Sequence, residues 1–252
     1  MTLRFSTGLR NNLAGNKGFA STFAKGSILI YSGTQPATAD SAVTGTLLGT
    51  VTLASGVLTQ ETRASQTITI AGSAGSINTV TVSTLNIIPG GAVPWNTSTT
   101  QTASDLCDAI NRDGLFDATV SGAVVTVLAP RGAGTTYNTL VFATTVTTLT
   151  ATVGAGTITG GVAAVNGLTF AAPVGGTVSK SGIWSFNGAA VGTAGWFRLI
   201  ASSSDAGGSS TVLERMDGSV AVSGADMNLS NISVAIGALN TIDTFAYTQP
   251  AQ

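Results

Sequence analysis

The sequence predicts a mainly β protein with a β-sandwich or barrel-like core, short N-terminal helices and an interrupting small α+β module. Three observations lead to this prediction. Short runs of Val, Ile, Thr and aromatic residues recur along the chain and are separated by Gly-rich turns, as in all-β folds. Only one segment has the apolar spacing of a long helix. Similar strand patterns occur before residue 60 and after residue 162, on either side of a region of different character.

The composition limits the classes of partner. The chain has 252 residues, of which 43% are hydrophobic and 8% are charged, against roughly 25% charged in ordinary soluble domains. It can therefore bury an apolar core, which disordered chains cannot do. The net charge is −1 and the basic residues are scattered singly, so nothing favours nucleic acid as a partner. Gly, Thr, Ser and Pro interrupt every apolar run before the about 20 residues of a membrane-spanning helix, so we expect no membrane insertion.

The first region, residues 1–60, begins with two short helices. Ser6 is suited to cap a helix in which Leu9 and Leu13 stand one turn apart on one face. Phe19 and Phe23 repeat that spacing in the next segment. Apolar runs at 28–33 and 46–53 then predict two strands.

The middle region, residues 61–161, predicts an α+β module. Alternating Thr and Ile residues from 66 to 71 and a similar pattern from residue 78 predict half-buried strands. Two β-branched runs around Ser121-Gly122 predict a hairpin.

The helix of this module is predicted within residues 102–114. We expect Thr102 and Asp105 to form a capping box and Gly114 to end the helix. Its apolar stripe would contain Leu106, Ala109 and Ile110.

The last region, residues 162–252, contains five strand patterns at regular spacing, which is typical of a sandwich or barrel. Asp217-Gly218 is the strongest hairpin signal in the chain. Trp184 and Trp196 are expected to fill the core. We further expect Trp196→Ala to cause a large loss of stability and Phe197→Ala a small one, because neighbouring side chains alternate between the two faces of a strand and only Trp196 is expected to be buried.

These regions predict two domains, one of them discontinuous. Residues 1–60 and 162–252 are expected to form the β core, and residues 61–161 to be inserted into it. Such an insertion is tolerated because the entropy cost of loop closure grows slowly with loop length.

Catalytic and cofactor sites are not expected. The absence of histidine excludes Ser-His-Asp and Cys-His sites, and Cys107 alone cannot complete a zinc site. No phosphate-binding loop occurs. A Ca²⁺ site that uses Asp205 or Asp226 and a carboxylate pair for glycoside hydrolysis remain alternatives. We expect no catalytic residue, cofactor or resident metal, and hence no enzyme.

The N-terminal segment is the candidate attachment site. Helices this short are marginal in water and need a surface that covers their apolar side chains. That surface is either a neighbouring subunit, with basic residues guiding the docking, or the protein's own sheet. The proposed attachment residues are Leu9, Leu13, Phe19, Phe23, Arg4 and Arg10.

Several segments resemble the small virion structural proteins of tailed bacteriophages. They are LRFSTGLRNNLAG, ILIYSGTQPATADSAVTGTLLGTVTL, TAGWFRLI, MDGSVAVSGADMNLS and TIDTFAYTQP. The middle region, with TASDLCDAINRDG, resembles a β-rich module of phage tail, sheath and decoration proteins. The resemblance to virion structural proteins covers residues 1–60 and 162–252, a little more than half of the chain, and transfers no catalytic residue.

The resemblance implies a non-enzymatic particle component, located in the virion and assembled in the host bacterial cytoplasm. A capsid decoration (cement) protein on the head lattice is the first expectation. Its partners would be the major capsid protein or neighbouring virion subunits, and the chain would be a homo-oligomer. The alternative is a tail, collar or fibre-base component, including a receptor- or carbohydrate-binding module.

Overall fold

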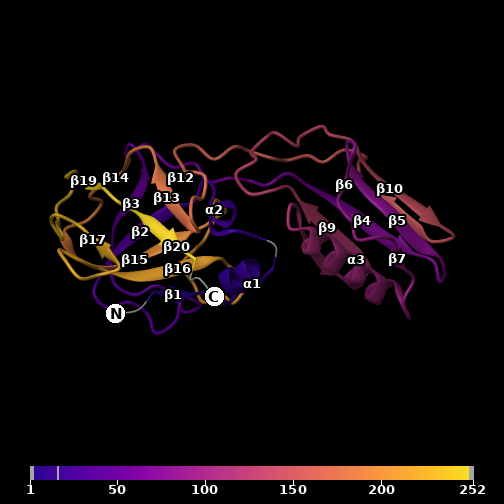
Figure 1. The fold of residues 1–252 in the computed structure, drawn as a ribbon, viewed down its shortest axis with the longest axis horizontal. Coiled ribbons are helices and arrows are strands. Elements are labelled where there is room, and N and C mark those ends of the chain that lie inside the picture. The colour runs from indigo at the N-terminus through magenta and orange to yellow at the C-terminus, as the bar shows by residue number, and fades with distance from the viewer. Residues whose placement is uncertain (1–2, 16, 250–252) are drawn as a thin grey trace. The chain divides into compact units, whose positions relative to one another are not determined.

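The structure is a computed structural model that describes residues 3–15 and 17–249. It is mainly β, as the sequence predicts, and its several sheets are built almost entirely from antiparallel pairs (Figure 1). The chain forms two compact units. Unit 1 runs up to Ala14, continues from Gly18 to Glu61 and resumes at Ala164, whereas unit 2 is Thr62–Ala163 with the short segment around Lys17. Each unit has an apolar core of its own.

Unit 1 contains two short helices and two sheets. Its elements are β1 (Arg4–Phe5), α1 (Thr7–Ala14), α2 (Phe19–Thr22), β2 (Ser27–Ser32), β3 (Leu47–Leu53), β12 (Thr169–Phe170), β13 (Thr177–Ser181), β14 (Trp184–Asn187), β15 (Gly192–Ile200), β16 (Arg215–Ala221), β17 (Met227–Asn228), β18 (Ser233–Val234), β19 (Leu239–Ile242) and β20 (Ala246–Thr248). The main sheet has the order β1-β16-β15-β2-β3-β14-β19, with β17 and β18 paired to β16 and β15. The smaller sheet has the order β12-β13-β20.

One face of the main sheet is apolar. Ile28 and Ile30 of β2 lie beside Phe197 and Leu199 of β15, and all four are buried. Side chains of the small sheet and of both helices pack on this face and complete a two-layer, sandwich-like core. In the view of Figure 1, the yellow strand β20 crosses over the main sheet.

Unit 2 contains two four-stranded sheets and one long helix. Its elements are β4 (Ser65–Ala71), β5 (Ser76–Val82), β6 (Leu85–Asn86), β7 (Val93–Pro94), α3 (Thr99–Asp113), β8 (Asp117–Ser121), β9 (Val124–Leu128), β10 (Phe142–Thr147) and β11 (Thr150–Val153). One sheet has the order β10-β5-β6 with β7 paired to β5, and the other has the order β11-β4-β9-β8. The predicted hairpin is present, because β8 and β9 pair around Gly122.

The helix of unit 2 begins three residues earlier than the sequence predicts. Its N-cap is Ser98, whose side chain accepts a hydrogen bond from the Gln101 N–H at 3.1 Å. Thr102 is buried inside the helix, where its hydroxyl donates to the Ser98 carbonyl, so the expected capping box is wrong. Gly114 ends the helix in the left-handed conformation at φ 78°, as predicted.

The predicted hairpin at Asp217-Gly218 is also wrong, because both residues lie within the single strand β16. Asp217 pairs with Arg198 of β15 on one side and with Arg4 of β1 on the other. Gly218 is directly opposite Phe197, and a Cβ atom at Gly218 would lie 2.5 Å from that ring. The glycine therefore makes room for an aromatic ring instead of forming a turn.

Both predicted core tryptophans, Trp184 and Trp196, are fully buried. The expectation that only one of Trp196 and Phe197 is buried is wrong, since Phe197 is 1% exposed. The two side chains do point to opposite faces of β15. The sheet is covered on both sides, so each face of the strand is interior.

Candidate functional site

The first helix of the proposed attachment segment is capped as predicted. The Leu9 N–H donates to the Ser6 side chain at 3.1 Å, and α1 starts at the next residue, Thr7. Leu9 is fully buried and Leu13 is half-buried against the same core. The leucine stripe therefore faces the interior of unit 1.

The second pair of apolar residues is covered by aromatic side chains of unit 1. Phe19 stacks on Tyr247 of β20 at 4.2 Å between ring centroids and lies 4.9 Å from Phe23. Phe170 and Phe245 surround the same ring. Phe19 and Phe23 are 3% and 0% exposed. Of the two alternatives for this segment, the structure adopts the one in which the protein's own sheets cover the stripe.

The two arginines of the segment differ in exposure. Arg4 is half-buried on β1 and its guanidinium donates to the carbonyl of Pro36. Arg10 is exposed and donates to the Thr7 hydroxyl at 2.9 Å. Of the six proposed attachment residues, only Arg10 is fully available to a partner.

The second face of the main sheet holds a buried ionic layer, which the sequence analysis missed. Arg198 donates from Nε and Nη2 to the two carboxylate oxygens of Asp217, both at 2.7 Å. Arg215 donates to both oxygens of Asp205 at 2.6 and 2.5 Å. None of these four side chains is more than 4% exposed.

Two loops close this layer. Arg198 Nη2 also donates to the Ser41 carbonyl at 3.1 Å, and Asp205 accepts the Gly207 N–H at 2.8 Å. The Val43 N–H in turn donates to the Gly207 carbonyl at 2.9 Å. The 34–46 and 201–214 loops are thereby joined to each other and to the sheet. The one sequence signal for this layer is the period-two alternation of β15, which places Arg198 on the same face of the strand as Trp196.

Burial perturbs the ionisable groups of the layer. Burial raises the pKa of the Asp217 carboxyl, although the hydrogen bond and charge of Arg198 oppose the shift. Burial likewise raises the pKa of Tyr31, whose ring stacks on Trp196 at 4.5 Å. With each carboxylate paired to a guanidinium, the arrangement is suited to hold loops in place. The Asp205 carboxylate, an alternative Ca²⁺ ligand, is used in this way.

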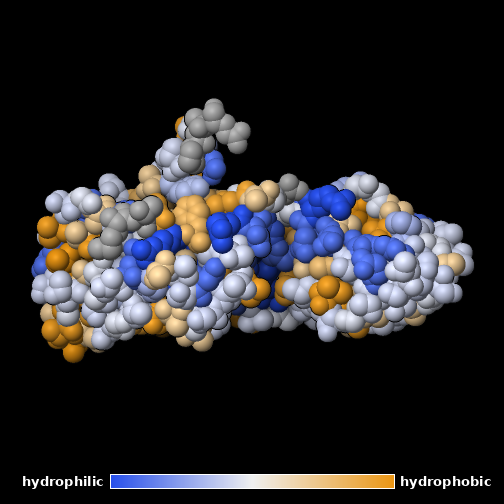
Figure 2. All heavy atoms as spheres, turned by 90° about the horizontal axis from the view of Figure 1, so that it is seen from below, coloured by the Kyte–Doolittle hydropathy of each residue, from blue (hydrophilic) through white to orange (hydrophobic). Residues whose placement is uncertain are grey.

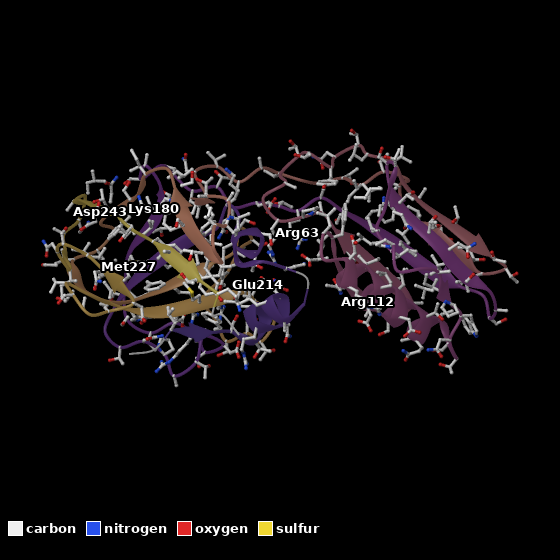
Figure 3. All side chains as sticks on the ribbon, viewed as in Figure 1. Arg63, Arg112, Lys180, Glu214, Met227 and Asp243 are labelled. Atoms are coloured by element: carbon white, nitrogen blue, oxygen red, sulfur yellow. The ribbon has the colours of Figure 1, made fainter. Side chains whose placement is uncertain are left out.

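In unit 2, several charged side chains lie along α3. Asp105, Asp108 and Arg112 line a cavity of about 550 Å³ against the 88–94 loop. The Asp105 carboxylate accepts hydrogen bonds from Asn96 and Gln101. Arg112 and the other labelled side chains can be followed in Figure 3. Within the described residues, no group of three or more His, Cys, Asp or Glu side chains is placed to hold a metal ion.

The lone cysteine lies on the buried side of α3. Cys107 is 6% exposed, and burial raises the pKa of its thiol, while the Asp108 charge acts in the same direction. A reactive cysteine needs the opposite shift. In the described part of the chain, no helix is long and apolar enough to cross a membrane.

Exposed aliphatic side chains lie between polar ones on the outer surface, and on the face drawn in Figure 2 orange hydrophobic residues alternate with white and blue ones. Val191, Ile236 and Leu239 are 73%, 70% and 65% exposed. They lie on adjacent segments of unit 1, because the Gly237 N–H donates to the Gly188 carbonyl at 2.8 Å. We call these three residues the aliphatic cluster.

Comparison with known proteins adds no relationship. No protein-family model matches the sequence, and no curated protein matches it.

Proposed function

We propose that this chain is a non-enzymatic structural component of a tailed bacteriophage virion and that it decorates the head lattice. The observation that supports the proposal is the distribution of charge. Charged residues are only 8% of the chain, and several form interior ion pairs, such as Arg198–Asp217 and Arg215–Asp205. The surface that remains is neutral and partly aliphatic, which suits close packing against copies of a neutral lattice.

The aliphatic cluster is the part of unit 1 that we assign to lattice contact. Three large aliphatic side chains exposed on adjacent segments lose contact with water when a partner covers them, at about 25 cal/mol per Å². No charged residue interrupts the 188–191 and 235–239 segments that carry them. An uncharged contact of this kind needs no electrostatic steering.

A tail, collar or fibre-base component is the second candidate. A receptor- or carbohydrate-binding role within it would call for exposed aromatic rings. All six Trp and Tyr residues lie in the described part of the chain, and none of their side chains is exposed. This observation favours lattice contact over recognition of a sugar by aromatic stacking.

The proposal is tested by incubating purified chain with phage heads that lack it and sedimenting the heads. We expect saturable binding at hundreds of copies per head. Binding to tails alone, or a stoichiometry of a few copies per particle, would replace the decoration role with the tail role. No binding to heads or tails would reject both.

Variants of the aliphatic cluster test the assigned surface in the same assay. Ile236→Asp should abolish binding to heads while leaving the thermal unfolding of the chain unchanged. Val212→Asp is the matched control, because Val212 is 77% exposed and lies outside the cluster. Equal binding by the two variants would show that the contact lies elsewhere on the surface.

A further inference from the structure

The buried ionic layer contains polar atoms that its ion pairs do not satisfy. Among the described residues, Arg198 Nη1, Arg215 Nη1, Trp196 Nε1 and both amide atoms of Gln35 are buried and have no hydrogen-bond partner. A buried donor without a partner costs about 1–3 kcal/mol, more when it is charged, so native proteins rarely leave one unpaired. Four groups in one unit, all at most 5% exposed, therefore need a common explanation.

These groups lie in the same layer of unit 1. Trp196 and Arg198 are two residues apart on one face of β15, and the guanidinium carbon of Arg198 is 5.5 Å from the Trp196 ring centroid. Asp217 is directly opposite Arg198 on β16. Arg215 is two residues from Asp217 on the same strand, so it is the diagonal neighbour of Arg198.

Gln35 reaches this layer from the covering loop. Its carbonyl lies 3.5 Å from Nη1 of Arg4, and Arg4 pairs across the strands with Asp217. The Gln35 side chain is 5% exposed, so it is enclosed between the loop and the sheet.

The chemistry of the unpartnered atoms favours an anion. Every unpartnered nitrogen is a donor, and the amide oxygen of Gln35 is the one acceptor among these atoms. The carboxylates of Asp205 and Asp217 each accept two hydrogen bonds from a single guanidinium group, those of Arg215 and Arg198. The Asp40 and Asp226 carboxylates accept hydrogen bonds from Thr7 and Ser219.

We propose that unit 1 binds one inorganic anion of halide size in this layer. The N–H groups of Arg198 Nη1 and Arg215 Nη1 would bind it, together with Trp196 Nε1 and the amide nitrogen of Gln35. These side chains are at most 5% exposed, so the bound ion would be enclosed, and we expect a small anion to bind in preference to sulfate or phosphate. The bound ion would fasten the 34–46 loop to the sheet, because it joins a donor from that loop with donors from β15 and β16.

The first experiment measures thermal unfolding of the full chain at constant ionic strength. Chloride and bromide should each raise Tm by a few degrees, with a saturable dependence on concentration, relative to gluconate. Sulfate and phosphate should show no saturable rise. Equal Tm values in all five salts would overturn the proposal.

Variants with matched controls locate the site. Gln35→Met should abolish the bromide-dependent rise in Tm, with little loss of stability in gluconate, because its amide has no hydrogen-bond partner to lose. Gln66→Met is the control: the Gln66 amide donates to the Thr157 carbonyl and accepts the Thr67 N–H, so this variant should lose stability and keep the rise. A bromide response that survives Gln35→Met would contradict the assignment.

Diffraction from a bromide-soaked crystal of the unmodified chain decides the case without any variant. We expect one anomalous peak within contact distance of Arg198 Nη1 and Arg215 Nη1. An ordered water at that position, with no anomalous signal, would overturn the proposal and show that the donors are satisfied by solvent.

Discussion

Arg198 and Asp217 face each other across β15 and β16 and form a two-pronged ion pair in which neither side chain has any exposed surface. The pair lies on one face of the main sheet, and the opposite face packs into the apolar core of unit 1. Removing two charges from water is costly, and their attraction repays that cost only with good geometry and further hydrogen bonds. The Ser41 carbonyl supplies one such bond to Arg198.

Removing one partner of this ion pair should destabilise the fold much more than replacing both partners with apolar residues. Asp217→Asn leaves Arg198 as an uncompensated buried charge and should cost about 3–5 kcal/mol of unfolding free energy. The double variant Arg198→Met with Asp217→Leu should have an unfolding free energy close to that of the unmodified protein, or higher. Denaturant unfolding measures both, and Arg10→Ala, at an exposed position, should change stability by about 0.5 kcal/mol or less. A double variant as unstable as Asp217→Asn would contradict this account.

Alkaline stability should depend on Tyr31. Burial raises the pKa of Tyr31 above its ordinary value of 10.0, so above pH 10.0 the unfolded chain loses this proton while the folded chain keeps it. The folded state then binds more protons, and stability falls as the pH rises through this window. Tyr31→Phe should flatten the fall in unfolding free energy as the pH rises above about 10. Tyr137→Phe in unit 2 is the control, and equal slopes in the two variants would count against the prediction.

Trp196→Ala and Phe197→Ala should both cause a large loss of unfolding free energy. Each side chain is at most 1% exposed and each faces a different buried layer, so each truncation should cost about 3–5 kcal/mol. Chemical denaturation followed by far-UV circular dichroism would measure the two losses. A mild effect of either substitution would mean that the corresponding face of the sheet is open in solution.

Cys107 should resist alkylation until unit 2 unfolds. Its thiol is buried and burial raises its pKa, whereas alkylating reagents attack the exposed thiolate. Labelling with iodoacetamide should therefore follow the denaturation of unit 2, with fully denatured chain as the reference for the maximal rate. Rapid labelling in native buffer would show that α3 opens locally.

Unit 1 should fold without unit 2. The Thr59 and Val165 backbones exchange hydrogen bonds at 3.1 and 3.0 Å within unit 1, so a short Gly-Ser linker between Glu61 and Ala164 can replace residues 62–163. The apolar core of unit 1 contains no residue from that segment. The deletion variant should show a cooperative thermal transition. A gradual loss of structure on heating would indicate that unit 1 depends on unit 2.

The sequence by itself determined the local structure. Period-two alternation identified the strands, Ser6 and Gly114 marked the ends of helices, and the size of Trp184 and Trp196 marked them as core residues. These signals are local, because a cap or an alternating pattern involves only residues near one another in the chain.

Only the tertiary structure decided which distant residues meet. Asp217-Gly218 has the composition of a turn, but Arg198 and Phe197 on the adjacent strand hold it within β16. The stripe of Leu9, Phe19 and Phe23 has the pattern of an attachment surface, but β20 brings Tyr247 against it. Burial and pairing across strands depend on contacts between residues far apart in the sequence, and their free energies outweigh the smaller preferences of a local turn or an isolated helix.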